Sequence, residues 1–81
     1  MDLQDITSHS VLDTRGLSCP MPLLKTKKAL KGVPVGEVLE IWGTDPGSKN
    51  DIPDFGNKNG NAFLGFVDND EGYTRYFIRK G

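Results

Sequence analysis

Four short segments of the chain have the apolar content of β-strands, and two of them alternate clearly between apolar and polar positions. The predicted strands are His9–Asp13, Gly36–Gly43, Ala62–Val67 and Tyr73–Arg79. The acidic segment Asp68–Gly72 separates the last two strands. Because strands joined by a short turn pair with each other, we expect these two to form an antiparallel hairpin.

The alternation also predicts the face of the sheet on which a side chain lies. Leu39 and Ile41 share one face of the second predicted strand, and Trp42 lies on the other. By the same rule, Phe77 and Tyr76 lie on opposite faces of the last strand. We expect Trp42 and Phe77 on the sheet face that no helix covers, where a contiguous aromatic patch would mark a contact surface.

Between the first two strands, apolar and small residues recur at the three- and four-residue spacing of an amphipathic helix. Pro20 is expected at the first helical position, where proline is favoured, with Cys19 at or next to the N-cap. Gly32 and Pro34 end this helix. The stripe expected to be buried comprises Leu23, Thr26, Ala29, Leu30 and Val33.

A second helix is predicted after the second strand. Asp45 is expected to be its N-cap and Pro46 its first residue. Pro53 lies inside the segment and is expected to kink or restart the helix. Gly56 weakens the far end, so this helix is expected to be the less stable of the two.

The resulting order, β-α-β-α-β-β, predicts an α+β fold. Its first strand–helix–strand unit implies a right-handed crossover between two parallel strands. The simplest packing is a two-layer α/β sandwich, a four-stranded mixed sheet with both helices on one face. Residues 1–7 are expected to be a flexible leader, and residues 8–81 a single domain.

Composition narrows the function. Of the 81 residues, 36% are hydrophobic and 26% are charged, as in an ordinary folded domain. The formal net charge of −1 gives no global basic field, so direct nucleic-acid binding is not expected. The N-terminal residues lack the apolar core of a signal peptide, and no run approaches the ~20 apolar residues of a membrane span. We therefore expect a cytoplasmic protein without a membrane partner.

The chain has one cysteine, Cys19, and hence neither an internal disulfide nor a Cys-rich metal site. It follows a turn in which Gly16 is free to adopt a positive φ. Pro20 and Pro22 make the following helical turn rigid, and the amides of Met21 and Leu23 are expected to point toward the cap. The partial positive charge of a helix N-terminus stabilises a thiolate, which is the nucleophilic form of cysteine.

Positive side chains near Cys19 would add to this effect. Arg15 and Lys25 are close in sequence and are expected to raise the local potential. The less specific interpretation is that Cys19 is only a small cap residue or a buried apolar side chain. The two flanking prolines and the helix start favour an activated thiol that would hold a persulfide.

At these residues the chain resembles the TusA family of sulfur carriers. The resemblance lies in Leu12–Leu17, in the Cys-Pro-Met-Pro string from Cys19 to Pro22, in Thr44–Ser48, in Asp51–Phe55 and in Tyr76–Gly81. It implies the same sandwich fold, similar to the C-terminal domain of translation initiation factor three. It also implies that Cys19 is the persulfide site and that Pro20 and Pro22 shape its turn.

The resemblance further implies two kinds of protein partner. A cysteine desulfurase or a rhodanese-type protein donates the sulfur, and a downstream acceptor protein receives it for tRNA thiolation or for sulfur metabolism. No cofactor is expected other than the covalent persulfide. Some members carry a second cysteine where this chain has Gly56, so a resolving thiol within the chain is excluded.

A sulfur carrier must also dock on its partners. Leu24, Lys27 and Lys31 are expected on the outward side of the first helix, close to Cys19, and would suit an acidic partner. An equally good interpretation is a solvated lysine face. The resemblance adds Asp45 to the partner surface, beside its expected role as a helix cap. Site-shaping roles are expected of Arg15, Gly16, Pro20, Met21 and Pro22.

Two other functions fit the same residues. A regulatory or RNA-binding module without sulfur chemistry would show salt-sensitive RNA binding that survives Cys19→Ser. A redox or metal sensor at Cys19 would need a thiol from a partner or from a second copy, because the chain has no other cysteine.

Overall fold

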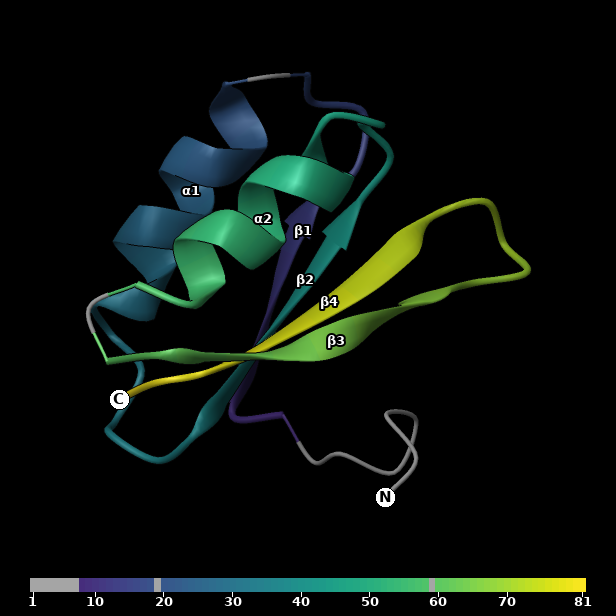
Figure 1. Cartoon of the computed structure of the whole chain (residues 1–81). Helices are drawn as coiled ribbons and strands as arrows, with labels where there is room; N and C mark the ends of the chain where they lie inside the picture. Colours follow the sequence, from purple (N-terminus) through teal and green to yellow (C-terminus); the bar gives the residue numbers. More distant parts are fainter. Residues whose placement is uncertain (1–7, 19, 59) are drawn as a thin grey trace.

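The computed structural model describes residues 8–18, 20–58 and 60–81, and six elements follow one another in this part of the chain (Figure 1). Their order is β-α-β-α-β-β, as predicted. The strands are β1 (Ser10–Thr14), β2 (Val38–Gly43), β3 (Ala62–Asp68) and β4 (Thr74–Arg79). The helices are α1 (Met21–Leu30) and α2 (Ser48–Gly56).

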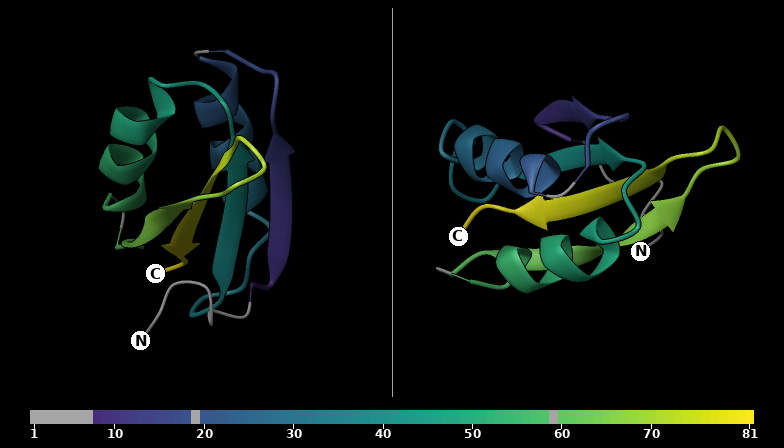
Figure 2. Two further views of the ribbon diagram at one scale, coloured as in Figure 1. Left: turned by 90° about the vertical axis from the view of Figure 1, so that its right-hand side faces the viewer. Right: turned by 90° about the horizontal axis from the view of Figure 1, so that it is seen from above.

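The strands form one mixed sheet in the order β1-β2-β4-β3. β1 and β2 are parallel, whereas β4 pairs antiparallel with both β2 and β3. Both helices pack on the same face of this sheet (Figure 2). The predicted α+β two-layer sandwich is therefore confirmed, including the parallel pair and the C-terminal hairpin.

The register places one residue of each strand in a row that runs across all four strands at one end of the sheet. Thr14 is paired with Gly43, Gly43 with Thr74, and Thr74 with Asp68. We call this row the loop edge. Because β1 and β2 are parallel, the loops that follow them both leave the sheet here.

The core lies between the sheet and the helices. Its fully buried members from β2 and β4 are Leu39, Ile41, Tyr76 and Ile78, and Ile52 joins them from α2. The predicted stripe of the first helix also faces this core, with Leu30 and Val33 at most 4% exposed and Thr26 fully buried. The Thr26 hydroxyl donates to the Pro22 carbonyl at 2.7 Å, which satisfies it inside the core.

On the other face of the sheet, Trp42 and Phe77 do not form an exposed aromatic patch. Phe77 is fully buried, and Trp42 is half-buried. The guanidinium of Arg75 lies 5.3 Å from the centre of the Phe77 ring, and that of Arg15 lies 5.0 Å from the centre of the Trp42 ring. The face assignment was correct, and a guanidinium lies over each ring.

α2 begins later than predicted. Gly47 is its N-cap, and no side chain caps it. Asp45 instead accepts the Ser48 amide on its backbone carbonyl, at 3.1 Å. The prediction that Asp45 and Pro46 begin the helix was therefore wrong. The helix also continues through Pro53 to Gly56 without restarting, since the buried residue Ile52 anchors it to the core.

Gly56 ends α2 against the sheet, and its substitution tests this packing. A Cβ placed there would lie 3.1 Å from Phe63 Cβ and 3.2 Å from Ile78 Cγ1. Crowding of this kind costs ~1–3 kcal/mol, so Gly56→Ala is expected to lower the urea midpoint. Gly32→Ala is the control, because the nearest atom to its Cβ is a carbonyl oxygen at 3.6 Å. Equal midpoints for the two variants would contradict this packing.

Candidate functional site

The turn before Cys19 is held at its base by Thr14. This residue is fully buried, and its hydroxyl donates to the Trp42 carbonyl at 2.6 Å. The Leu17 amide donates back to the Thr14 carbonyl at 3.1 Å, which closes the turn. Gly16 has a φ of 82°, so the expected positive φ is confirmed and favours glycine at this position.

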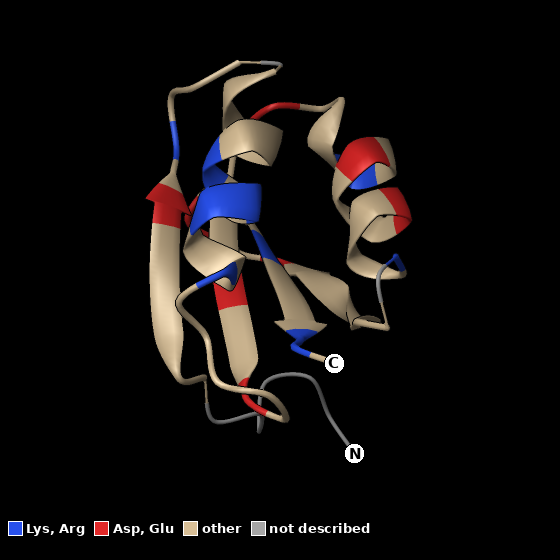
Figure 3. Ribbon diagram, turned by 90° about the vertical axis from the view of Figure 1, so that its left-hand side faces the viewer, with Lys and Arg blue, Asp and Glu red and all other residues tan. Residues whose placement is uncertain are grey.

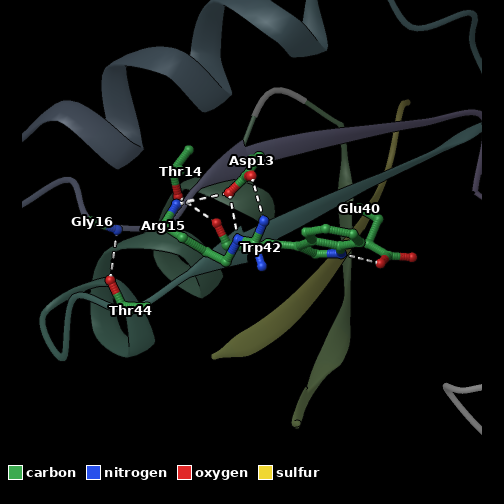
Figure 4. A network of polar contacts seen from close by, with 7 residues as sticks. All are labelled: Asp13, Thr14, Arg15, Gly16, Glu40, Trp42 and Thr44. Atoms are coloured by element: carbon green, nitrogen blue, oxygen red, sulfur yellow. Dashed lines mark hydrogen bonds and ion pairs between the residues drawn. The ribbon is translucent and has the colours of Figure 1, made fainter. Parts of the chain in front are cut away.

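A second contact connects this turn to the loop that follows β2. The Gly16 amide donates to Thr44 Oγ1 at 2.9 Å, across the loop edge (Figure 4). Two segments 28 residues apart in the sequence are thereby tied together. The turn that leads to Cys19 is therefore attached to β2 through both Thr14 and Gly16.

α1 begins one residue later than predicted. Pro20 is the N-cap, and Met21 is the first helical residue. The Met21 amide donates to the Ser18 carbonyl at 3.0 Å, so it is not directed at the cap as expected. Pro22 is buried and fixes the first turn of the helix against the core. Cys19 itself lies outside the described residues.

Arg15 is committed to other partners. Its guanidinium makes two hydrogen bonds to Asp13, at 2.9 and 2.8 Å, and lies over the ring of Trp42 (Figure 4). It also lies over the ring of Tyr73. The hydrogen bonds from Arg15 hold the pKa of Asp13 below its ordinary value. Because the carboxylate neutralises this cation, the expected contribution of Arg15 to the potential near Cys19 is largely cancelled.

The charge of α1 itself remains favourable for an anion at its N-terminus. The first turn of α1 has no acidic residue, and Lys27 and Lys28 lie in its last turn. The lysine bands of α1 contrast with the acidic bands of α2 in Figure 3. A thiolate or persulfide anion next to the helix start would meet no carboxylate from the first turn of α1.

The predicted partner residues of α1 lie at different positions along the helix. Leu24 is 49% exposed in the first half of α1. Lys27 and Lys31 line a groove between α1 and α2, and Lys31 is the C-cap of α1. The helix rise places Lys31 ~15 Å from Met21, so the predicted partner residues of α1 are distributed along the length of the helix.

Asp45 lies at the loop edge, where a cleft of about 350 Å³ separates the β2–α2 loop from the β3–β4 turn. Lys49 and Asp68 also line this cleft, and their side chains form an ion pair at 3.1 Å. Asp45 and Gly16, both predicted as site residues, are thus connected through the loop that contains Thr44. Sequence reasoning missed Thr44, since its partner is distant in the sequence and no local motif marks it.

Among the described residues, no cluster of three or more His, Asp or Glu side chains is suitable for holding a metal ion. Within the same ranges, neither helix has the length and apolar character needed to cross a membrane.

Comparisons with known proteins point in one direction. The family model described as "Sulfurtransferase TusA" matches residues 10–80. The sulfur carrier protein TusA of Allochromatium vinosum is 39% identical over 85% of this chain and 88% of that protein. The sulfur carrier protein TusA of Pseudomonas putida GB-1 is 36% identical over 96% of both chains.

A longer relative and a solved structure complete the comparison. YrkF of Bacillus subtilis is 48% identical over 88% of this chain, which corresponds to only 38% of that protein. The crystal structure of a SirA-like protein from Desulfitobacterium hafniense superposes with a TM-score of 0.77, at 22% identity, covering 89% of this chain and 97% of that one. At this identity the superposition bears on the fold alone.

Proposed function

The chain belongs to the TusA family of sulfur carrier proteins, and on this premise we propose that Cys19 carries the sulfur as a persulfide. The observation that carries the proposal is the place of the only cysteine in the sequence. Cys19 stands between Ser18 and Pro20, both exposed, directly before α1. A sulfur atom attached there would be accessible to a second protein, and the helix dipole would stabilise its anionic form.

The proposed relay consists of two displacements at sulfur. The Cys19 thiolate attacks the terminal sulfur of a donor persulfide; a new S–S bond forms, the donor S–S bond breaks, and the donor leaves as its thiolate. A nucleophile of the acceptor then attacks the terminal sulfur on Cys19. The bond to the Cys19 sulfur breaks, and Cys19 returns to the thiolate without net oxidation.

The neighbouring residues would act by positioning. Gly16, tied to Thr44, holds the turn before Cys19, and Pro22 anchors the helix start after it. Pro20 has no amide hydrogen and restricts the backbone next to the sulfur. Met21, at 43% exposure, would offer an apolar contact to a partner. Arg15 would keep the turn in place through Asp13.

Family membership as a sulfur carrier implies donors and acceptors of sulfur. We infer that the donor is a cysteine desulfurase or a rhodanese-type protein, and that a downstream protein accepts the sulfur for tRNA thiolation or sulfur metabolism. The chain would act in the cytoplasm as a sulfurtransferase that carries one sulfur atom per molecule. It would need no cofactor other than the covalent persulfide. Family membership also favours the sulfur carrier over the alternative function, a regulatory or RNA-binding module without sulfur chemistry.

The proposal is tested by mass spectrometry of proteolytic peptides. Reduced protein is incubated with a cysteine desulfurase and cysteine, and then digested. A gain of one sulfur atom on the peptide that contains Cys19, reversible by dithiothreitol, is the expected result. Sulfur on another peptide, or none under conditions in which the desulfurase is active, would refute it.

A partner surface formed by Leu24, Lys27, Lys31 and Asp45 remains part of the proposal. Reversing the charge of Lys27 and Lys31 to glutamate is expected to slow sulfur loading by about tenfold, because cations of this helix would attract an acidic donor. The loading rate is measured by quenched mass spectrometry at low salt. The matched control compares the single variants Lys27→Glu and Lys28→Glu, which change the same charge at adjacent positions of α1, with only Lys27 lining the groove. Equal slowing by these two single variants would show that net charge alone accounts for the effect.

A further inference from the structure

The groove between α1 and α2 is a concave surface, and two of its lining residues, Lys27 and Lys31, also belong to the proposed partner surface. It has a volume of about 520 Å³, within the range of small-molecule sites. Its apolar side chains are Leu23 and Leu30 of α1 and Phe55 of α2. Leu30 belongs to the buried core, and Leu23 and Phe55 pack against it. The groove therefore has an apolar base continuous with the core.

Cations surround this apolar base. Its described lining residues include four lysines and two aspartates, whereas the whole chain has ten basic and eleven acidic residues. The groove is thus locally positive in a protein whose net charge is −1. Lys27 lies 5.8 Å from the centre of the Phe55 ring, which places a cation directly beside the apolar base.

The two aspartates of the groove both belong to α2. Asp54 is paired with Lys58 at 3.4 Å, so its charge is partly neutralised within the same wall. On the opposite side, Lys80 donates to the Leu30 carbonyl at 2.8 Å, which fixes its ammonium group at the end of α1. The positive side of the groove is therefore formed by Lys27, Lys31 and Lys80, close to the C-terminal half of α1.

From these contacts we propose that the groove binds a small amphipathic organic anion, with an aliphatic or aromatic body and a carboxylate or similar head group. The body would lie on Leu23, Leu30 and Phe55 and bury their remaining apolar surface. The head group would accept hydrogen bonds from Lys27 and Lys31, beside the ammonium of Lys80. The site lies toward the C-terminal end of α1, and the inference does not depend on the persulfide.

Octanoate is the probe for this site. The ¹⁵N-labelled full chain is titrated with octanoate, and amide shifts in NMR spectra report where it binds. We expect the shifts to concentrate in the C-terminal halves of α1 and α2 and at residues 80–81, and the affinity to fall with added salt. Lys27→Gln/Lys31→Gln is expected to raise the Kd about tenfold, as the loss of two charge-assisted contacts predicts.

The controls distinguish binding at a specific site from nonspecific binding through net charge or hydrophobicity. Lys25→Gln/Lys28→Gln has the same net charge and is expected to keep the wild-type Kd. 1-Octanol and octylammonium, which lack the anionic head, are expected to bind at least several-fold more weakly. The proposal is overturned if the two lysine pairs behave alike, if either control ligand binds as tightly as octanoate, or if the shifts lie outside the groove.

Discussion

Cys19→Ser is expected to eliminate sulfur loading entirely, and with it any transfer to an acceptor. The hydroxyl of serine is not ionised near neutral pH and cannot displace a thiolate from a persulfide, whereas a thiolate can. In intact mass spectra, the wild-type chain should gain one sulfur atom and the variant none. This is the largest effect expected of any single substitution in the chain.

The loss must be shown to be chemical and not structural. Gly32→Ala, which leaves Cys19 in place, should load like the wild-type chain, and far-ultraviolet circular dichroism should show the same fold for Cys19→Ser. If the serine variant gained sulfur at a rate near that of the wild type, another group would be the sulfur acceptor and the assignment of Cys19 would be wrong. RNA binding that persists in this variant would point to an additional, sulfur-independent activity.

The second large effect is expected at Glu40, on the sheet face without helices. This residue is only 5% exposed. Its carboxylate accepts hydrogen bonds from Arg75, from the indole of Trp42 and, at 2.8 Å, from the Ser8 hydroxyl. Glu40→Gln would leave the Arg75 guanidinium without its carboxylate. Because Arg75 is partly exposed, we expect a loss of ~2–3 kcal/mol of unfolding free energy, less than for a fully buried pair.

This effect should depend on pH in a defined direction. Burial alone would raise the pKa of Glu40, but the hydrogen bonds from Arg75, Trp42 and Ser8 bring it below the ordinary value of 4.5. The folded chain therefore binds this proton less readily than the unfolded chain. Its stabilising contribution is complete above the unfolded pKa and is lost as the pH falls through the folded pKa.

Urea unfolding of the wild-type and Glu40→Gln chains from pH 7 to pH 3 measures this dependence. The difference in unfolding free energy between the two chains should be largest at pH 7. It should shrink below about pH 4.5, where the Glu40 carboxylate of the unfolded chain begins to bind protons. Asp13→Asn is the matched control, since its ion pair with Arg15 is solvent-exposed and should change stability little. A difference at Glu40 that does not vary with pH would exclude this carboxylate as its source.

The fold was predictable because it depends on short, local periodicities. The two-residue alternation placed Leu39 and Ile41 in the core correctly, and the helical spacing did the same for Thr26 and Leu30. The boundaries were less accurate. Asp45 has the side chain of an N-cap, but the backbone hydrogen bond that it accepts from Ser48 leaves Gly47 in that position.

The site was predictable only in part, because its contacts join distant segments. Gly16 was identified from its neighbours, yet its partner Thr44 depends on the parallel pairing of β1 with β2. The groove-facing position of Lys27 follows from where α2 packs, which the pattern of α1 alone does not contain.

β1 lies at the end of the strand order, so its backbone is bonded to β2 and to no other described strand. The segment that leads to Cys19 is therefore attached mainly to β2, through Thr14 and Thr44, and it contacts the turn between β3 and β4 through Arg15 and Tyr73. That turn is a tolerant insertion point: a fluorescent or affinity tag placed at Asp70 would leave the sulfur-bearing segment oriented as before.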